Sequence, residues 1–167
     1  MSPLGPQTSI SIRPMQDSDL PFIRQGLSET NWQDIPDDQR KFLDRIKADQ
    51  RIFDDFDRYR KTERFKFKVF TAVASDGKPV GYVSIGDNSN PAVGLPLGAV
   101  LDFWVAPEHR GKGIGGMLLD HALEQIRAQG YTHASILVSA SNRTAVGMYE
   151  KRGFYPDRVV MVKPLKS

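Results

Sequence analysis

One stretch decides how the chain is interpreted, and it reads Pro107-Glu108-His109-Arg110-Gly111-Lys112-Gly113-Ile114-Gly115-Gly116. The residues before it, 98–105, form an apolar run typical of a strand, and the apolar spacing over 114–126 predicts a helix that ends at Gly130. Glycines let the backbone turn tightly and approach a ligand, and the first amides of a helix are unpaired donors that favour an anion. With Arg110 and Lys112 beside these amides, the stretch predicts a pyrophosphate site.

Three interpretations of this glycine turn compete. The pattern G-x-G-x-x-G within 111–116 matches a dinucleotide-binding fingerprint, but the next strand-like run ends in Ser139 instead of the acidic residue that would bind a ribose. A Walker A loop is excluded because Gly113, not Ser or Thr, follows Lys112. A turn without a ligand is the remaining alternative, and the density of glycines with flanking cations favours the ligand site.

Strand and helix patterns alternate along the rest of the chain. The predicted elements are a strand at 10–13, a helix capped by Asp17 or Ser18, one or two amphipathic helices within 34–68, a hairpin of 69–74 and 80–85, a strand at 135–139, a helix at 143–151 and a last strand at 158–162. The apolar positions at helical spacing within 34–68 are Phe42, Ile46, Phe53 and Phe56. We predict a flexible tail at residues 1–8, a single domain at 9–167, and an α/β fold with a mixed sheet.

The amino-acid composition excludes several classes of function. The 167 residues carry a formal net charge of +3, a smaller excess than a nucleic-acid coat or a polybasic membrane anchor usually shows. The absence of cysteine excludes disulfides, cysteine–zinc sites, iron–sulfur clusters and a cysteine nucleophile, and the three histidines are scattered, so we expect no metal. Because no apolar run approaches the ~20 residues of a membrane span and the N-terminus does not resemble a signal peptide, we expect a cytoplasmic protein without membrane contact.

Two blocks of sequence together resemble a known family. The first resembles the acetyl-CoA signature of the GNAT superfamily of N-acetyltransferases and consists of Val105-Ala106-Pro107 followed by Arg110-x-x-Gly113-x-Gly115. The second consists of Asn142, Ala145, Tyr149 and Gly153-Phe154. The resemblance implies a central mixed sheet flanked by helices in the order β-α-α-β-β-β-α-β-α-β, with acetyl-CoA as co-substrate.

The resemblance also implies a set of acetyl-CoA contacts, namely Phe103, Trp104, Val105, Arg110, Gly111, Lys112, Gly113, Ile114, Gly115, Gly116 and Asn142. The backbone of 103–105 would bind the pantetheine arm as an added strand does. A backbone N–H of the same strand, near a β-bulge found in the family, would bind the oxyanion. Asn142 has an alternative role as the N-cap of the helix that follows it.

Two side chains are candidates for the proton transfers of acetylation. An alkyl ammonium, with a pKa near ~10.4, must lose a proton before it attacks a thioester. Asp102 lies in an apolar run that suits a general base, although a contact with a buried backbone group or a cation explains it equally. Tyr149 matches the tyrosine near the cofactor sulfur in the family and is the candidate acid, with packing on a short helix as the alternative. Without a cysteine, direct attack of the amine on the thioester is the preferred route.

The predicted acceptor is an amine, on a peptide or protein or on a small cationic molecule. In the family the acceptor site is built largely from the first helices, their connecting loop and the last hairpin. Here the acidic and aromatic residues of 29–38 suit a cation, although a solvated turn explains them equally. Only fourteen residues follow Gly153, so the closing hairpin is reduced to one strand, and the site is either open or completed by the second subunit of a homodimer.

Two functions of other classes stay open. Residues 58–68 carry six cations and one acid interleaved with aromatics, a mixture that suits RNA, but a strand with Phe65 and Phe67 pointing inward is the simpler interpretation. The other alternative is an acyl-CoA-binding sensor without catalysis, and turnover of an amine distinguishes it from an enzyme.

Overall fold

The computed structural model describes residues 9–62, 65–90 and 92–165. The tail predicted at residues 1–8 therefore lies outside the described residues. Residues up to Leu137 belong to one compact unit, and residues from Val138 onward belong to another. Within these ranges no helix has the length and apolar character needed to cross a membrane.

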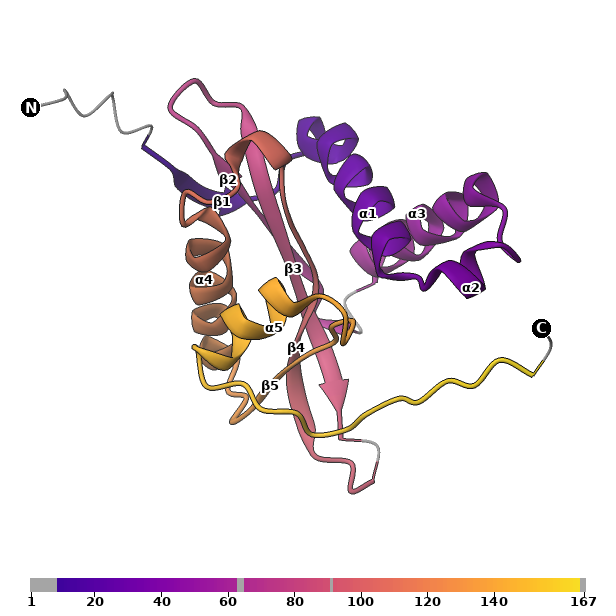
Figure 1. Ribbon diagram of the computed structural model, residues 1–167. Helices are drawn as coiled ribbons and strands as arrows, with labels where there is room; N and C mark the ends of the chain where they lie inside the picture. The colour runs from indigo at the N-terminus through magenta and orange to yellow at the C-terminus, as the bar shows by residue number, and fades with distance from the viewer. Residues whose placement is uncertain (1–8, 63–64, 91, 166–167) are drawn as a thin grey trace, which may run out of the picture. The chain divides into compact units, whose positions relative to one another are not determined.

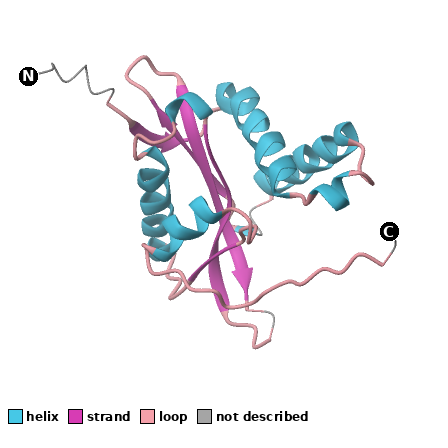
Figure 2. Ribbon diagram, in the orientation of Figure 1, coloured by secondary structure: helices cyan, strands magenta, loops and turns pink. Residues whose placement is uncertain are grey.

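The first unit is built on a five-stranded mixed sheet (Figures 1 and 2). Its strands follow one another in space in the order of the chain: β1 (Ser11–Pro14), β2 (Lys68–Val73), β3 (Pro79–Ser89), β4 (Pro96–Val105) and β5 (Ala134–Ile136). Neighbours pair antiparallel except β4 and β5, which are parallel. The predicted mixed sheet is confirmed.

Helices cover both faces of this sheet. Figure 1 shows α1 (Leu20–Asp34) and α3 (Arg45–Lys61) on one side and α4 (Ile114–Ala128) on the other. The short α2 (Asp37–Arg40) lies between α1 and α3 in the chain, so three helices separate β1 from β2 where the predicted order has two. The extra break follows from Pro36, because a proline disfavours helical backbone at the residue before it and ends α1 there.

The core on the α1 side depends on a close contact between helix and sheet. A Cβ atom at Gly26 would lie 2.5 Å from the Tyr82 ring and 2.8 Å from the Trp104 ring, so only glycine lets α1 lie this near. Around this contact the buried apolar residues are Ile23, Leu27, Phe56, Val69 and Ala106. Phe42 and Ile46 are not part of the core and are 76% and 82% exposed, because they lie in the turn after α2 and the first turn of α3.

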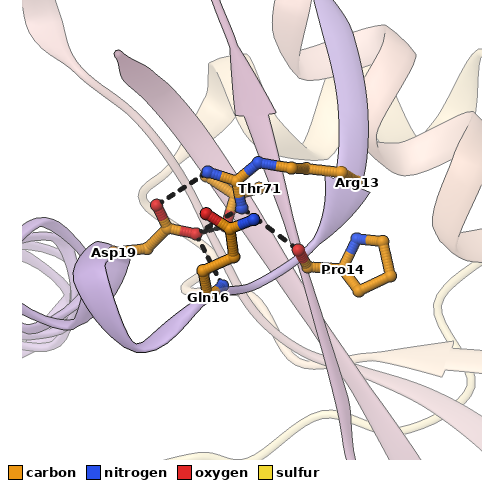
Figure 3. Close-up of polar contacts among 5 residues, drawn as sticks. All are labelled: Arg13, Pro14, Gln16, Asp19 and Thr71. Atoms are coloured by element: carbon orange, nitrogen blue, oxygen red, sulfur yellow. Dashed lines mark hydrogen bonds and ion pairs between the residues drawn. The ribbon is translucent and has the colours of Figure 1, made fainter. Parts of the chain in front are cut away.

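An ion pair ties the start of the chain to the sheet (Figure 3). The Arg13 guanidinium on β1 lies 2.6 Å from the Asp19 carboxylate, which also accepts hydrogen bonds from the Gln16 N–H and the Thr71 hydroxyl. Burial alone would raise the pKa of Asp19, but these donors outweigh it and lower the pKa. Gln16 and Asp19 together cap the turn that leads into α1, whereas the sequence predicted a cap at Asp17 or Ser18.

The second unit contains α5 (Arg143–Glu150) and an extended C-terminal segment. The Asn142 side chain accepts from the N–H of Ala145 at 3.2 Å and caps the helix, which Gly153 follows with a φ of 84°. The last strand predicted at 158–162 is wrong, since the described residues after α5 contain no strand. A strand needs a neighbour for its backbone groups, and the apolar side chains of this segment are exposed instead.

Candidate functional site

A β-bulge interrupts β4 at the centre of the sheet. Ser84 of β3 faces Asp102, but the next residue of β3 faces Val100, so Leu101 is an extra residue in β4. On the other side of β4, pairing with β5 reaches only Val100 and Ile136. From Leu101 to its end, β4 therefore has one edge that the described β5 does not cover.

The residues on this open edge follow from the alternation of the antiparallel ladder. Ala106 donates its N–H to the Val80 carbonyl at 3.0 Å, and hydrogen-bonded pairs recur at every second residue. The backbone groups of Trp104 thus point at β3, and those of Phe103 and Val105 point toward the open edge. Two of the three residues predicted to bind an extended ligand through their backbone thus face the open edge, and the binding itself stays a prediction.

Two of the four backbone N–H and carbonyl groups of Phe103 and Val105 already form hydrogen bonds with side chains. The Phe103 N–H donates to the Asp102 carboxylate at 2.6 Å, and the Val105 carbonyl accepts from Arg110 Nε at 2.9 Å. In the part of the chain that the structure describes, the Phe103 carbonyl and the Val105 N–H have no such partner. One acceptor and one donor are left for a ligand.

The glycine turn continues directly from this edge. Gly111 and Gly113 have φ values of 73° and 79°, and a Cβ atom built on either would meet nothing within 4 Å. The first backbone hydrogen bond of α4 runs from Met117 N–H to the Gly113 carbonyl, and no side chain caps the helix. Three amides are thus free of helical acceptors at the open start of α4, those of Ile114, Gly115 and Gly116.

The two cations of the turn are held by backbone carbonyl groups, one at the end of β4 and one in the turn itself. Arg110 is fixed by the Val105 carbonyl, and Lys112 Nζ donates to the Glu108 carbonyl at 2.9 Å. Positive charge, free amides and open space at Gly113 suit an anion such as a pyrophosphate. The cofactor residues predicted in the first unit lie in the end of β4, the glycine turn and the first turn of α4, and their binding of a cofactor stays a prediction.

An acidic cluster of Asp34, Tyr82 and Asp102 lies on the α1 side of the sheet. Burial raises the pKa of Asp102 to about 6, and the Asp34 charge adds to the rise, while hydrogen bonding from the Phe103 N–H and from Tyr82 opposes it. The pKa of Asp34 is also raised, because protein replaces part of the water around a side chain that is otherwise exposed. A carboxyl with a pKa near 6 is ionised at neutral pH and can still accept a proton.

Tyr82 is the member of this cluster that the sequence did not identify. Its side chain is fully buried, and burial followed by the Asp102 charge raises its pKa. Its hydroxyl lies beside Asp102, so that hydrogen bonding between the two groups raises the pKa of Tyr82 and lowers that of Asp102. Alternation within 80–85 could have placed residue 82 on one face, but not opposite Trp104, because the pairing register is not local.

Asn142 and Tyr149 belong to the second unit. Asn142 has the capping role that was the ordinary explanation for it, and the Tyr149 ring packs against Phe154 with their centroids 5.9 Å apart. The pairing of Tyr149 with Asp102 as acid and base stays a prediction.

The interpretation of the basic segment 58–68 as a strand, with Phe65 and Phe67 pointing inward, is wrong. Residues up to Lys61 end α3, residues 63–64 lie outside the described residues, and β2 begins only at Lys68. Arg58 pairs with Asp55, at 3.1 Å. Arg60 likewise lies 2.7 Å from Asp17, so two of the cations of this segment are paired with carboxylates, which weakens the case for a surface that binds RNA.

Comparison with known proteins gives a consistent result. A family model described as "Acetyltransferase (GNAT) family" matches residues 29–154. The streptothricin acetyltransferase of Streptomyces lavendulae is 37% identical over 87 residues, which are 52% of this chain and 44% of that protein. The chain spans about half the length of the curated relatives it matches.

Two solved structures share the fold. A Pyrococcus furiosus protein assigned as an acetyl transferase has a TM-score of 0.77 at 22% identity, covering 94% of this chain and all of that one. An aminoglycoside N-acetyltransferase, AAC(6')-Iy, in complex with CoA has a TM-score of 0.69 at 19% identity, covering 99% of this chain and all of that one. At these identities the likeness concerns the fold alone.

Proposed function

Because the chain belongs to the GNAT acetyltransferase family, we propose that it transfers the acetyl group of acetyl-CoA directly to an amine. One observation carries the proposal, the open edge of β4 that continues into the free amides at the start of α4. An extended arm suits the edge and a pyrophosphate suits the amides, and CoA has both. Acetyl-CoA supplies the acetyl group as an activated thioester.

The residues of 103–116 divide the binding between them. The Phe103 carbonyl and the Val105 N–H bind the pantetheine arm, whereas the backbone of Trp104 is turned toward β3 and supports them. The amides at the start of α4 hold the pyrophosphate, and the cations of the turn balance its charge. Asn142 is kept as a cofactor contact on the resemblance alone.

Asp102 and Tyr149 handle the protons in this proposal. Asp102, ionised above about pH 6, takes a proton from the acceptor ammonium, directly or through a water, so that the neutral nitrogen can attack the carbonyl carbon. As the carbon–nitrogen bond forms and the carbon–sulfur bond breaks, Tyr149 supplies a proton to the leaving sulfur. A backbone N–H of β4 near the bulge donates to the developing oxyanion.

The acceptor is an amine of a peptide or protein, or of a small cationic molecule. One relative is named for streptothricin and another for a ribosomal protein, so both acceptor classes stay in the proposal. The cytoplasmic location and the homodimer suggested by the sequence also stay predictions.

The proposal is tested with an amine panel and detection of released CoA thiol. The chain has no cysteine, so after removal of reductants any thiol that appears comes from the cofactor. We expect saturable binding of acetyl-CoA by calorimetry and thiol release with at least one amine. Binding without release for any amine would support the sensor instead, and RNA binding that weakens steeply with salt would restore the nucleic-acid alternative.

A further inference from the structure

The Phe103 N–H points into the gap that opens where the pairing of β4 with β5 ends. Its two neighbours, Asp102 and Trp104, both face residues of β3 across the ladder, so the backbone groups of Phe103 are directed away from β3. On that side, the pairing of β4 with the described β5 reaches only Val100, just before the bulge at Leu101. Phe103 therefore carries the first N–H on the open edge after the bulge.

The side chain of Asp102 occupies this N–H. Its carboxylate accepts from the Phe103 N–H at 2.6 Å, a short distance that is expected when the acceptor is charged. Donor and acceptor belong to consecutive residues, so rotation about the side-chain bonds of Asp102 is enough to break the contact. The N–H is thus blocked by a group that can leave without any movement of the backbone.

The Asp102 carboxylate and a thioester carbonyl compete for the same donor. A carbonyl oxygen that enters the gap beside Phe103 finds the N–H already engaged by the carboxylate. The carboxylate charge, held within hydrogen-bond distance of that N–H, also repels the negative charge that develops on the carbonyl oxygen during acyl transfer. The Phe103 N–H therefore cannot stabilise an oxyanion while Asp102 stays in this position.

We propose that Asp102 blocks the Phe103 N–H until the acceptor ammonium draws the carboxylate away, so that the oxyanion donor is available only when an amine is bound. The inference rests on the proposed function and deepens it, because it names the β4 residue whose N–H binds the oxyanion and gives Asp102 a second role. An ammonium offers the carboxylate three donors and a full charge in place of one neutral N–H. Leaving Phe103 also removes a hydrogen bond that lowers the pKa of Asp102, so the carboxylate becomes a stronger base as it reaches the amine.

The order of events protects the thioester from water. The ammonium gives a proton to Asp102, and the neutral nitrogen attacks the thioester carbon, whose oxygen takes the negative charge and accepts from the Phe103 N–H. When the carbonyl re-forms, the carbon–sulfur bond breaks, the nitrogen loses its second proton and the sulfur leaves with one. Acceptor ammonium and acetyl-CoA thus give the amide, the CoA thiol and one proton, which Asp102 holds. Without an amine, the N–H stays blocked and hydrolysis to acetate and CoA is suppressed.

Two substitutions separate the blocking role of Asp102 from its role as a base. Asp102→Asn and Asp102→Ala both lack the base, but only asparagine keeps an oxygen that accepts from the Phe103 N–H. The probes are acetyl-CoA and S-ethyl-CoA, which has a methylene group where acetyl-CoA has the carbonyl. By calorimetry, Asp102→Ala should bind acetyl-CoA about 5- to 10-fold more tightly than S-ethyl-CoA, the effect of one hydrogen bond, whereas the wild type and Asp102→Asn should bind both within about 2-fold. The same affinity ratio in Asp102→Ala and the wild type would overturn the proposal.

Hydrolysis of acetyl-CoA without an amine gives a second measurement on the same variants. Thiol release should be at least about 10-fold faster in Asp102→Ala than in Asp102→Asn, because only the alanine variant frees the oxyanion donor. With an amine, both variants should acetylate slowly, since neither can take the proton. A purely structural role for Asp102 does not predict faster hydrolysis, so equal rates in the two variants would contradict the block.

Hydrogen exchange at the Phe103 amide tests the contact without any ligand and keeps the two proposals distinguishable. By NMR, this amide should exchange about 10-fold faster in Asp102→Ala than in the wild type and Asp102→Asn, because the hydrogen bond is lost. The Val105 N–H, on the same edge, is the internal control and should keep its rate. If no amine releases thiol, the proposed function fails while this measurement still judges the block. Equal exchange at Phe103 in all three proteins disproves the block whatever the transferase assay gives.

Discussion

The glycine turn suits an anion and the acidic cluster suits a cation, and the two regions are built from different kinds of groups. At the turn, the donors are backbone amides at the start of α4, exposed because Gly111 and Gly113 have positive φ. In the cluster, the groups are side chains far apart in the chain, since the charge of Asp34 at the end of α1 helps to raise the pKa of Asp102 on β4. The residues of the first site are ten consecutive positions of the sequence, whereas those of the second come together only in the folded chain.

The two sites are therefore sensitive to different kinds of substitution. Only a substitution by proline removes a backbone N–H, so other substitutions disrupt the turn by altering its conformation or by adding charge to it. The cluster depends on individual carboxyl groups, and a single atom exchange in one of them abolishes its charge. Substitutions at the turn should therefore change the affinity for acetyl-CoA, whereas substitutions in the cluster should change the reaction of the acceptor amine.

The largest effect is expected from Asp102→Asn. We expect kcat/KM at pH 7.5 to fall about 100- to 1000-fold, because the variant cannot accept the acceptor proton. In the wild type kcat/KM should rise with pH through about 6, the pKa of Asp102, and the variant should lack this rise. A similar kcat/KM in both proteins would mean that Asp102 has only a structural role.

Stability measurements on the same pair check that the loss is chemical. Because the folded-state pKa of Asp102 is raised, the folded chain holds this proton more tightly than the unfolded chain does. The Asp102 contribution to stability is therefore lost as pH rises from about 4 to about 6. Asp102→Asn should not show that loss, and at pH 7.5 its free energy of unfolding should be no lower than that of the wild type.

A smaller effect is expected from Gly113→Asp, paired with Gly77→Asp. Both glycines have φ near 80° and open space where a Cβ atom would lie, so the two variants should lose similar stability, about 1 kcal/mol. Only the Gly113 variant places a carboxylate beside the α4 amides. Its dissociation constant for acetyl-CoA should rise about 100-fold, equivalent to about 2.7 kcal/mol, with no change in the Gly77 variant. Equal affinities in the two variants would contradict a pyrophosphate site at the turn.

The smallest effect is expected from Tyr149→Phe. Loss of one hydroxyl should lower kcat about 10-fold and leave acetyl-CoA affinity unchanged, since the ring contact with Phe154 is kept. Tyr155→Phe removes a hydroxyl from an exposed tyrosine of the same unit and is the control. An equal kcat for the two variants would remove Tyr149 from the proton path.

Local patterns were enough for several parts of the structure. The strand, glycine turn and helix of 98–128 follow one another without a break, so hydrophobic spacing and the glycines that punctuate it identify them. The cap at Asn142 is equally local. Local patterns gave wrong predictions where the structure of a segment depends on another segment that packs or pairs with it. The predicted strand at 158–162 has no neighbouring strand in its unit, and Phe42 and Ile46 are exposed despite their helical spacing.

The sequence by itself determined the order of elements around the glycine turn, the family resemblance, and the residues most suited to bind an anion and move a proton. All of these depend on neighbours within a few positions. The tertiary structure decided that Leu101 bulges, that Phe103 and Val105 face the open edge, and that Asp34 and Tyr82 join Asp102. These depend on strand register and on how near a helix lies to a sheet, which are set by contacts between residues distant in the chain.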